Sequence, residues 1–267
     1  GRDIAGLDLR LRSDNPRDNI SAKNAVFCEL TAIYWAWKND LASEWIGFMH
    51  YRRFLNFSQQ QCPADEEGCV QVHGLEEERI RFLGLDPSSI ESCLRANPDV
   101  QAFLPGRLSV KGGGHYSAQE QYAESDYHYI GDLKVTRDVV AELFPEDLQY
   151  YDMMLSDHEV YLANLFVMRR ALFLEYCEWI FPIVFEVERR LDLTNYCVQA
   201  RRVIGYLSER LLDAFIRKQR LEHGLKVLEL QRIFVDLPEP AVAEPHLAVK
   251  PHPDALPVVV ASDNAFV

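Results

Sequence analysis

The chain has no long apolar run. A helix needs about 18 to 20 consecutive apolar residues to cross a bilayer. The longest apolar stretch, residues 179–185, is short, contains Pro182 and ends in charge. We also recognise no signal peptide. The sequence therefore predicts a protein without a membrane-spanning helix, and we expect it in the cytoplasm.

Positive charge is scarce as well. The 267 residues include 28 Lys and Arg against 41 Asp and Glu, which gives a net charge of −13. Proteins that bind nucleic acid or an anionic membrane over a broad surface need clustered positive charge. We therefore expect no nucleic-acid partner, while a local basic site is compatible with this balance.

A regular cysteine framework is also missing. The six cysteines are scattered, and Cys28, Cys177 and Cys197 lie in apolar helical patterns. A free thiol in such a position behaves as a small buried hydrophobic group. This usage indicates a reducing compartment, in agreement with a cytoplasmic protein.

Strand and helix patterns alternate along most of the chain. Apolar runs predict short strands at residues 45–49, 100–104 and 161–168. Helical spacing and capping signals predict helices near residues 21–39, 76–83, 86–96 and 197–219. Residues 58–74 have the composition of an irregular acidic insertion. Strands that alternate with helices are typical of a layered α/β fold.

The last part of the chain has a different composition. Six of the 13 prolines fall between Pro238 and Pro257, which is typical of an extended linker over residues 237–256. An apolar run then begins at residue 257 and continues into polar residues. We expect residues 1–236 to form one domain, and residues 257–267 to be the first strand of a further one.

Three potential cations follow the predicted strand at 45–49, namely His50, Arg52 and Arg53. Open α/β sheets bind ligands at the carboxyl ends of their strands, and Arg binds phosphate oxygens with two parallel hydrogen bonds. These residues therefore predict an anion site. In the alternative interpretation, the two arginines pair with carboxylates to hold the fold and the histidine is a core residue.

A second polar group precedes the first helix. Lys23 lies between Asn19 and Asn24, and a helix amino terminus favours anions. We expect these three residues to join the anion site.

Three ordered motifs resemble the signature of a known bacterial family. They are Asn-Ile-Ser-x-Lys-Asn at 19–24, Cys-Glu-Leu-Thr-x-x-Tyr-Trp-x-Trp-Lys-Asn at 28–39, and Gly-x-x-His-Tyr-Arg-Arg at 47–53. The family occurs in gene clusters for capsule, O-antigen and exopolysaccharide synthesis. It was long a domain of unknown function and is now regarded as a family of glycosyltransferases. Further matches lie at residues 120–128, 164–168, 176–179 and 202–211.

The resemblance implies a nucleotide-sugar-binding fold of the GT-A type, an α/β three-layer sandwich with a mixed, mainly parallel sheet. The family's customary opening strand, with its Thr-His-Lys-like ending, is absent, which leaves open whether the sheet lacks its first strand. Residues 257–267 resemble the opening strand of a family 8 glycosyltransferase, so the intact protein is expected to carry a following transferase domain.

The function implied by the resemblance is transfer of a hexose, galactofuranose in particular, from a UDP-sugar to a growing surface polysaccharide. The acceptor would be a lipid-linked or oligosaccharide glycan, and the intact protein would associate peripherally with the inner face of the plasma membrane. The alternative is a non-catalytic glycan-binding or scaffolding module that serves the following transferase.

The resemblance also suggests roles for individual residues. Glu209 would be the catalytic base, unless it only forms a salt bridge with a neighbouring arginine. His50, Arg52 and Arg53, with Asn19, Lys23 and Asn24, would bind the donor diphosphate. Sugar and acceptor contacts would come from Asn164, Tyr122, His128, His115 and Arg202.

Metal use is left open by the sequence. Many GT-A enzymes hold Mg²⁺ or Mn²⁺ with an Asp-x-Asp motif, and this chain contains none. Asp157 and Glu159 are reserve candidates for a metal or for the base. The cations after the strand at 45–49 would otherwise replace the metal in neutralising the leaving diphosphate.

Overall fold

The structure is a computed structural model that describes residues 14–58 and 60–236. Its α-helices are α2 (Asn24–Phe27), α3 (Leu30–Asn39), α4 (Glu77–Phe82), α5 (Pro87–Ala96), α6 (Ala118–Glu124), α7 (Ile130–Leu143), α8 (Leu148–Ser156), α9 (Arg170–Arg190) and α10 (Val203–His223). Its strands are β1 (Trp45–Phe48), β2 (Arg53–Leu55), β3 (Cys69–His73), β4 (Ala102–Pro105), β5 (Leu108–Ser109), β6 (Glu159–Val160), β7 (Phe166–Arg169), β8 (Val227–Leu230) and β9 (Arg232–Asp236).

The central sheet has the strand order β1-β7-β4-β8. Strand β7 runs antiparallel to both β1 and β4, and only β4 and β8 run parallel. The predicted α/β fold with a mixed sheet is confirmed. The expectation of a mainly parallel sheet is wrong for the described strands, because β7 enters the sheet between β1 and β4 in the opposite direction.

Side chains of the central sheet alternate between two apolar cores. Phe166 and Met168 of β7 belong to the larger core, whereas Leu165 and Val167 belong to a second core on the opposite face. This is the two-residue period of a strand that is covered on both faces. The sheet is therefore the middle of three layers, as expected.

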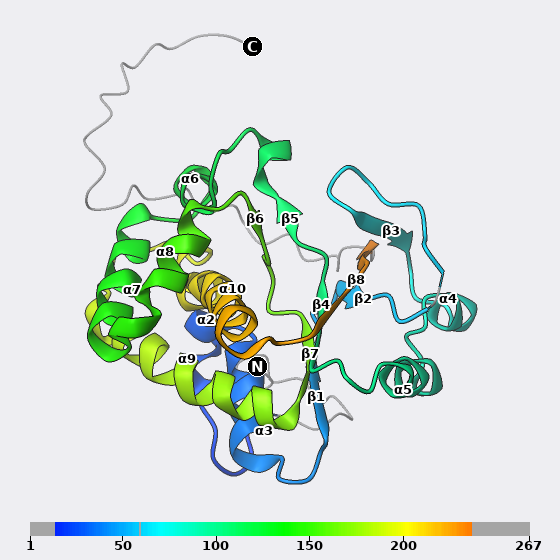
Figure 1. The fold of residues 1–267 in the computed structure, drawn as a ribbon. Coiled ribbons are helices and arrows are strands. Elements are labelled where there is room, and N and C mark those ends of the chain that lie inside the picture. Colours follow the sequence, from blue (N-terminus) through cyan, green and yellow to red (C-terminus); the bar gives the residue numbers. More distant parts are fainter. Residues whose placement is uncertain (1–13, 59, 237–267) are drawn as a thin grey trace, which may run out of the picture.

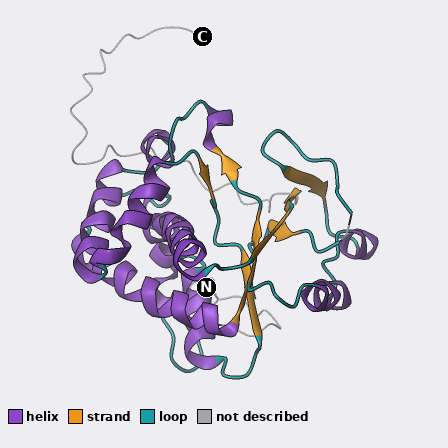
Figure 2. Cartoon of the chain, in the orientation of Figure 1, coloured by secondary structure: helices purple, strands orange, loops and turns teal. Residues whose placement is uncertain are grey.

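Figure 1 shows the two outer layers. Helices α3, α7, α8, α9 and α10 lie on one side of the sheet, and α4 and α5 lie on the other. The layer with α7, α8, α9 and α10 is the larger of the two, as the purple helices of Figure 2 show. Helix α10 packs against α8, α9, α2 and α7, and even Arg210 on this helix is buried.

A second, smaller sheet joins distant parts of the chain. Its order is β2-β9-β3, with β2 antiparallel and β3 parallel to the central strand β9. Part of the stretch 58–74 is therefore a strand, which corrects the expectation of an irregular insertion. The small sheet places Arg53 of β2 directly opposite Phe234 of β9.

The chain is strained and closely packed at the break between α2 and α3. Cys28 has φ 50° and ψ −127°, a backbone conformation that a residue with a side chain rarely adopts. Helix α10 passes so close that a methyl group on Gly205 would lie 2.9 Å from the Cys28 sulfur. Only glycine fits at this crossing, and the break leaves Glu29 at the start of α3.

Within the described residues, no helix combines the length and apolarity required to cross a bilayer. The expected linker at 237–256 and the expected strand at 257–267 lie outside the described residues.

The crossing at Gly205 can be tested with Gly205→Ala. The added methyl group meets Cys28 at less than contact distance, so we expect the free energy of unfolding to fall by about 1–3 kcal/mol in chemical denaturation. Gly131→Ala in α7 is the matched control, because a Cβ there meets nothing within 4 Å. It should leave stability unchanged or raise it by up to about 1 kcal/mol. Cys28→Gly should partly rescue Gly205→Ala, and equal losses at the two glycines would contradict this account.

Candidate active site

A cavity of about 360 Å³ opens where strand β1 ends beside helix α10. We call it the first compartment. Its wall combines three arginines and a histidine with two carboxylates, and the lining residues are Cys28, Glu29, His50, Tyr51, Arg52, Arg53, Arg202, Gly205, Tyr206, Glu209 and Phe234.

A second compartment of about 450 Å³ adjoins the first. The two share Arg53, Tyr206, Glu209 and Phe234. The second is lined further by residues of the small sheet, of β5, of helices α6 and α10 and of the loops before β3, after α6 and after β6, namely Glu67, Cys69, Gln71, Leu108, Gln121, His128, Leu162, Arg210 and Arg232. Glu209 therefore lies at the junction of two connected compartments.

One face of the small sheet forms the wall between them. Successive strand residues point to opposite faces, so Arg232 and Phe234 of β9 share a face with Arg53 of β2 and Gln71 of β3. All four line the second compartment. The alternate residues Ile233 and Val235 are fully buried on the other face.

A tight turn delivers the cationic segment after β1. The backbone N–H groups of His50 and Arg53 each donate to the other residue's carbonyl oxygen, at 3.1 and 3.3 Å. The carbonyl oxygen of Arg52 accepts a hydrogen bond of 2.8 Å from the N–H of Val235. The backbone of this segment is thus fixed, while the side chains of His50, Arg52 and Arg53 line the first compartment.

Arg52 and Arg53 differ from arginines such as Arg217, which pairs with two carboxylates. Among the described residues, Arg52 and Arg53 form no ion pair with a carboxylate, although the chain has 41 acidic residues. The Nε atom of Arg52 is buried and has no hydrogen-bond partner among the described residues. The alternative that these two arginines hold the fold through carboxylates therefore finds no support in the described residues.

Arg202 and Arg232 add positive charge to the two compartments. Arg202 donates to the Cys28 sulfur at 3.4 Å, and Arg232 donates to the carbonyl of Gly106 at 3.3 Å. Burial is the main cause that lowers the pKa of Arg232, and repulsion from the neighbouring Arg53 guanidinium lowers it further. An anion between them would relieve that repulsion.

The two carboxylates of the first compartment have opposite environments. Burial raises the pKa of Glu209, and Arg210, whose Nη1 lies 2.9 Å from Oε2, offsets only part of that shift. Burial also opposes ionisation of Glu29, but contacts with His50 and Asn164 outweigh it and lower the pKa of Glu29. Paired groups with divergent pKa values mark acid–base sites, and the carboxylate suited to accept a proton is Glu209.

Contacts in the wall of the second compartment hold Glu209 in place. Arg210 is 2% exposed and donates to Glu209, to the Tyr206 carbonyl and to Gln121. Its guanidinium lies 5.0 Å from the ring of Tyr122, which stacks on His128.

His128 is a neutral lining residue. Burial, together with the nearby charge of Arg210, lowers its pKa to about 3. It therefore faces the second compartment as an uncharged imidazole. Tyr122 is fully buried beneath it and supports the wall rather than lining it.

Several predicted site residues lie elsewhere. Lys23 pairs with Glu188 at 2.7 Å, Asn24 donates to the Cys28 carbonyl, and Asn19 donates to carbonyls of its own loop. None of the three lines either compartment, so the structure does not bring them to the anion site. His115 likewise lies outside both and approaches Glu124 at 3.2 Å.

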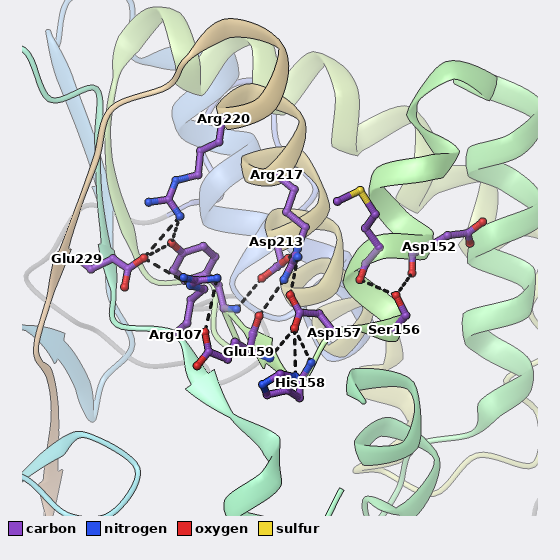
Figure 3. A network of polar contacts seen from close by, with 12 residues as sticks. Arg107, Asp152, Ser156, Asp157, His158, Glu159, Asp213, Arg217, Arg220 and Glu229 are labelled. Carbon is purple, nitrogen blue, oxygen red and sulfur yellow. Dashed lines mark hydrogen bonds and ion pairs between the residues drawn. The ribbon is translucent and has the colours of Figure 1, made fainter. Parts of the chain in front are cut away.

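The reserve candidates Asp157 and Glu159 belong to a separate network (Figure 3). Arg217 donates to Asp157 at 2.8 Å and to the backbone carbonyl of Glu159, and it also pairs with the buried Asp213. Burial opposes ionisation of Asp157, but Arg217 outweighs it and lowers the pKa of Asp157. Neither reserve candidate lines either compartment. Across residues 14–58 and 60–236, no three His, Cys, Asp or Glu side chains are grouped as metal ligands.

The residues not anticipated from the sequence are Glu29, Tyr206, Arg210, Arg232 and Phe234. Glu29 is part of the motif at 28–39, so its motif position was the available signal. Arg232 and Phe234 alternate with Ile233 and Val235, and this period of two is the sequence signal of a strand with one buried face.

The contrast between paired and unpaired arginines predicts different stabilities for two variants. Arg217→Ala leaves the buried Asp213 without its partner and should lower the free energy of unfolding by about 3–5 kcal/mol. Arg53→Ala removes no ion pair and should change it by no more than about 0.5 kcal/mol. Chemical denaturation of both variants measures the difference. A large loss for Arg53→Ala would show a structural role for this side chain.

Residues 1–220 match the family model described as "Domain of unknown function (DUF4422)". The chain is also similar to the apo structure of WbbM, described as a bifunctional glycosyltransferase, with 36% identity and a TM-score of 0.83. The match covers 88% of this chain and 41% of that chain, so this chain spans about two fifths of WbbM. No curated protein matches. The predicted GT-A-like α/β fold is confirmed by this similarity, and the chain belongs to the DUF4422 family.

Proposed function

We propose that this chain is a glycosyltransferase that transfers a hexose from a UDP-sugar to a glycan acceptor. The observation that carries the proposal is the pairing, in one cavity, of guanidinium groups without carboxylate partners and a carboxylate whose pKa is raised by burial. Glycosyl transfer needs both groups, since the leaving diphosphate must be neutralised and the acceptor hydroxyl must lose a proton. The similarity to WbbM, a glycosyltransferase, supports the same reaction class.

The donor diphosphate would lie in the first compartment. Arg52 and Arg53 present planar forks that match phosphate oxygens, and His50 and Arg202 complete the cationic wall. The described residues offer no three-ligand metal group and no Asp-x-Asp, so the residues present do not fit the usual metal site. In this proposal the arginines neutralise the diphosphate.

The acceptor would enter through the second compartment, because Glu209 lies at the junction of the two. Its hydroxyl oxygen attacks the anomeric carbon of the donor sugar and its proton passes to Glu209. The bond from that carbon to the diphosphate oxygen breaks, and UDP leaves with the electron pair. A single displacement of this kind inverts the anomeric configuration.

The cellular setting follows the same proposal. We place the protein at the cytoplasmic face of the membrane, where its six free thiols stay reduced. The acceptor would be a lipid-linked or oligosaccharide precursor of a surface polysaccharide, with galactofuranose as the transferred hexose. A second transferase domain would follow this one in the intact protein.

Donor binding can be tested by calorimetry with UDP. Each guanidinium–phosphate contact contributes about 1.5–3 kcal/mol, so Arg52→Ala and Arg53→Ala should each weaken UDP binding by about ten- to a hundredfold. Arg81→Ala is the matched control, since Arg81 is 70% exposed on α4 and pairs only with Glu77. Unchanged UDP affinity in both cavity variants would remove the diphosphate role. Absence of UDP binding by the unaltered chain would favour a non-catalytic glycan-binding module.

The base can be tested with Glu209→Gln. The amide cannot take the hydroxyl proton, so we expect kcat to fall by about 10²–10⁴-fold, as for loss of a general base. UDP affinity should be kept, because Arg52 and Arg53 are intact. UDP release with a lipid-linked acceptor measures the rate. Since the pKa of Glu209 is raised, the acid limb of the pH–rate profile should lie above the ordinary range of a glutamate. Full turnover in Glu209→Gln would exclude this base.

A further inference from the structure

Glu29 is an unexpected residue for an anion site. It lines the first compartment beside Arg52 and Arg53, and its lowered pKa keeps it ionised. A fixed negative charge repels a diphosphate, so by charge alone this carboxylate weakens donor binding. Its presence needs a compensating role.

The contacts of Glu29 supply that role. Its Oε1 atom lies 3.4 Å from Nε2 of His50. Within the described residues this ring nitrogen is buried and has no hydrogen-bond partner that meets normal geometry. The His50 side chain is 15% exposed and Glu29 is 21% exposed, so water competes only weakly for this contact.

Glu29 is in turn fixed from behind. The amide nitrogen of Asn164 donates to Oε1 of Glu29 at 2.7 Å and to Oγ of Ser208 at 2.6 Å. Its two N–H groups are thus both used, and Ser208 donates onward to the Gly205 carbonyl at 2.7 Å. Asn164 and Ser208 are fully buried and line neither compartment. They reach the cavity only through Glu29.

The ionised state of Glu29 sets the direction of the amide. A flipped Asn164 would point its carbonyl oxygen at the carboxylate and lose both donated bonds. In the observed orientation Oδ1 is buried without a partner in the described residues. The amide of Asn164 thus holds the carboxylate of Glu29 in place, while its own Oδ1 accepts no hydrogen bond from the described residues.

We propose that Glu29 is a positioning residue that holds the imidazole of His50 in place against the donor diphosphate, with Asn164 and Ser208 holding Glu29. The inference rests on the proposed donor site, because His50 needs a ligand to act on. It assigns to the Cys-Glu-Leu-Thr motif a function in the cavity, and it explains why the chain breaks its first helix at Cys28, directly before Glu29.

The two effects of Glu29, charge repulsion and positioning of His50, predict opposite changes in UDP affinity for Glu29→Gln. A double-mutant cycle with His50 therefore separates them. Glu29→Gln removes repulsion but also removes the strong acceptor for His50. If Glu29 acts through His50, Glu29→Gln weakens UDP binding by about three- to thirtyfold in the unaltered chain. In a His50→Gln background the same change leaves UDP binding equal or tighter. Calorimetry with UDP measures all four proteins.

Glu29→Asp provides a second variant. It keeps the charge but withdraws the carboxylate by one methylene, so positioning predicts weaker UDP binding here too. Thermal unfolding of each variant checks that the fold is kept. Additive effects of Glu29→Gln and His50→Gln, or tighter binding in Glu29→Gln alone, would overturn the proposal.

A ligand-free measurement separates this proposal from the proposed function. The carboxyl carbon of Glu29 can be titrated by NMR in the unaltered chain and in His50→Gln. Loss of the His50 contact should raise the pKa of Glu29, because burial then dominates. Other titratable groups that interact with Glu29, namely Arg202, Cys28, Glu209 and Tyr176, are the same in both proteins. An unchanged pKa of Glu29 in His50→Gln would refute the Glu29–His50 contact even if UDP binds. A raised pKa of Glu29 without UDP binding would refute only the proposed donor site.

Discussion

The close crossing of helix α10 over the break at Cys28 is the constraint on which the site depends. Gly205 permits it, because any side chain there would meet the Cys28 sulfur. The crossing brings Glu29, at the start of α3, within reach of Ser208 and Glu209 on α10 through Asn164. Both carboxylates of the first compartment thus lie close to one tight contact, between Gly205 and the side chain of Cys28, which are 177 positions apart in the sequence.

Arginines that hold the fold and arginines that line the cavity differ in their ion pairs. In the network of Figure 3, Arg217 joins Asp157, Asp213 and the chain at Glu159, and it ties α10 to the β6 region. Such a pair is costly to break because its charges are buried. Arg52 and Arg53 have no such partner in the described part of the chain. In a protein with an excess of acidic residues, unpaired guanidinium groups in a cavity indicate a binding site for an anion.

Part of this site could be predicted from the sequence and part could not. Local apolar and charge patterns predict the strand at 45–49 and the cations after it, and the structure has this strand at 45–48. The candidate roles of Asn164 and Glu209 came from the resemblance to a family, and of these two residues Glu209 lines the compartments whereas Asn164 does not. The small sheet could not be predicted, because β3 and β9 pair over some 160 residues and no short-range signal encodes such pairing. Lys23 was placed wrongly for the same reason. Its partner Glu188 lies 165 positions away, and in this ion pair Lys23 lines neither compartment.

The two glutamates show why residue type alone did not assign roles. Both line the first compartment, both are largely buried, and each contacts a basic residue. Glu29 receives hydrogen bonds that favour its charged form, whereas Glu209 receives only partial compensation from Arg210 and tends to take up a proton. The same type of side chain therefore has a lowered pKa at one wall of the compartment and a raised pKa at the other. The difference comes from Asn164 and His50, which only the folded chain brings to Glu29.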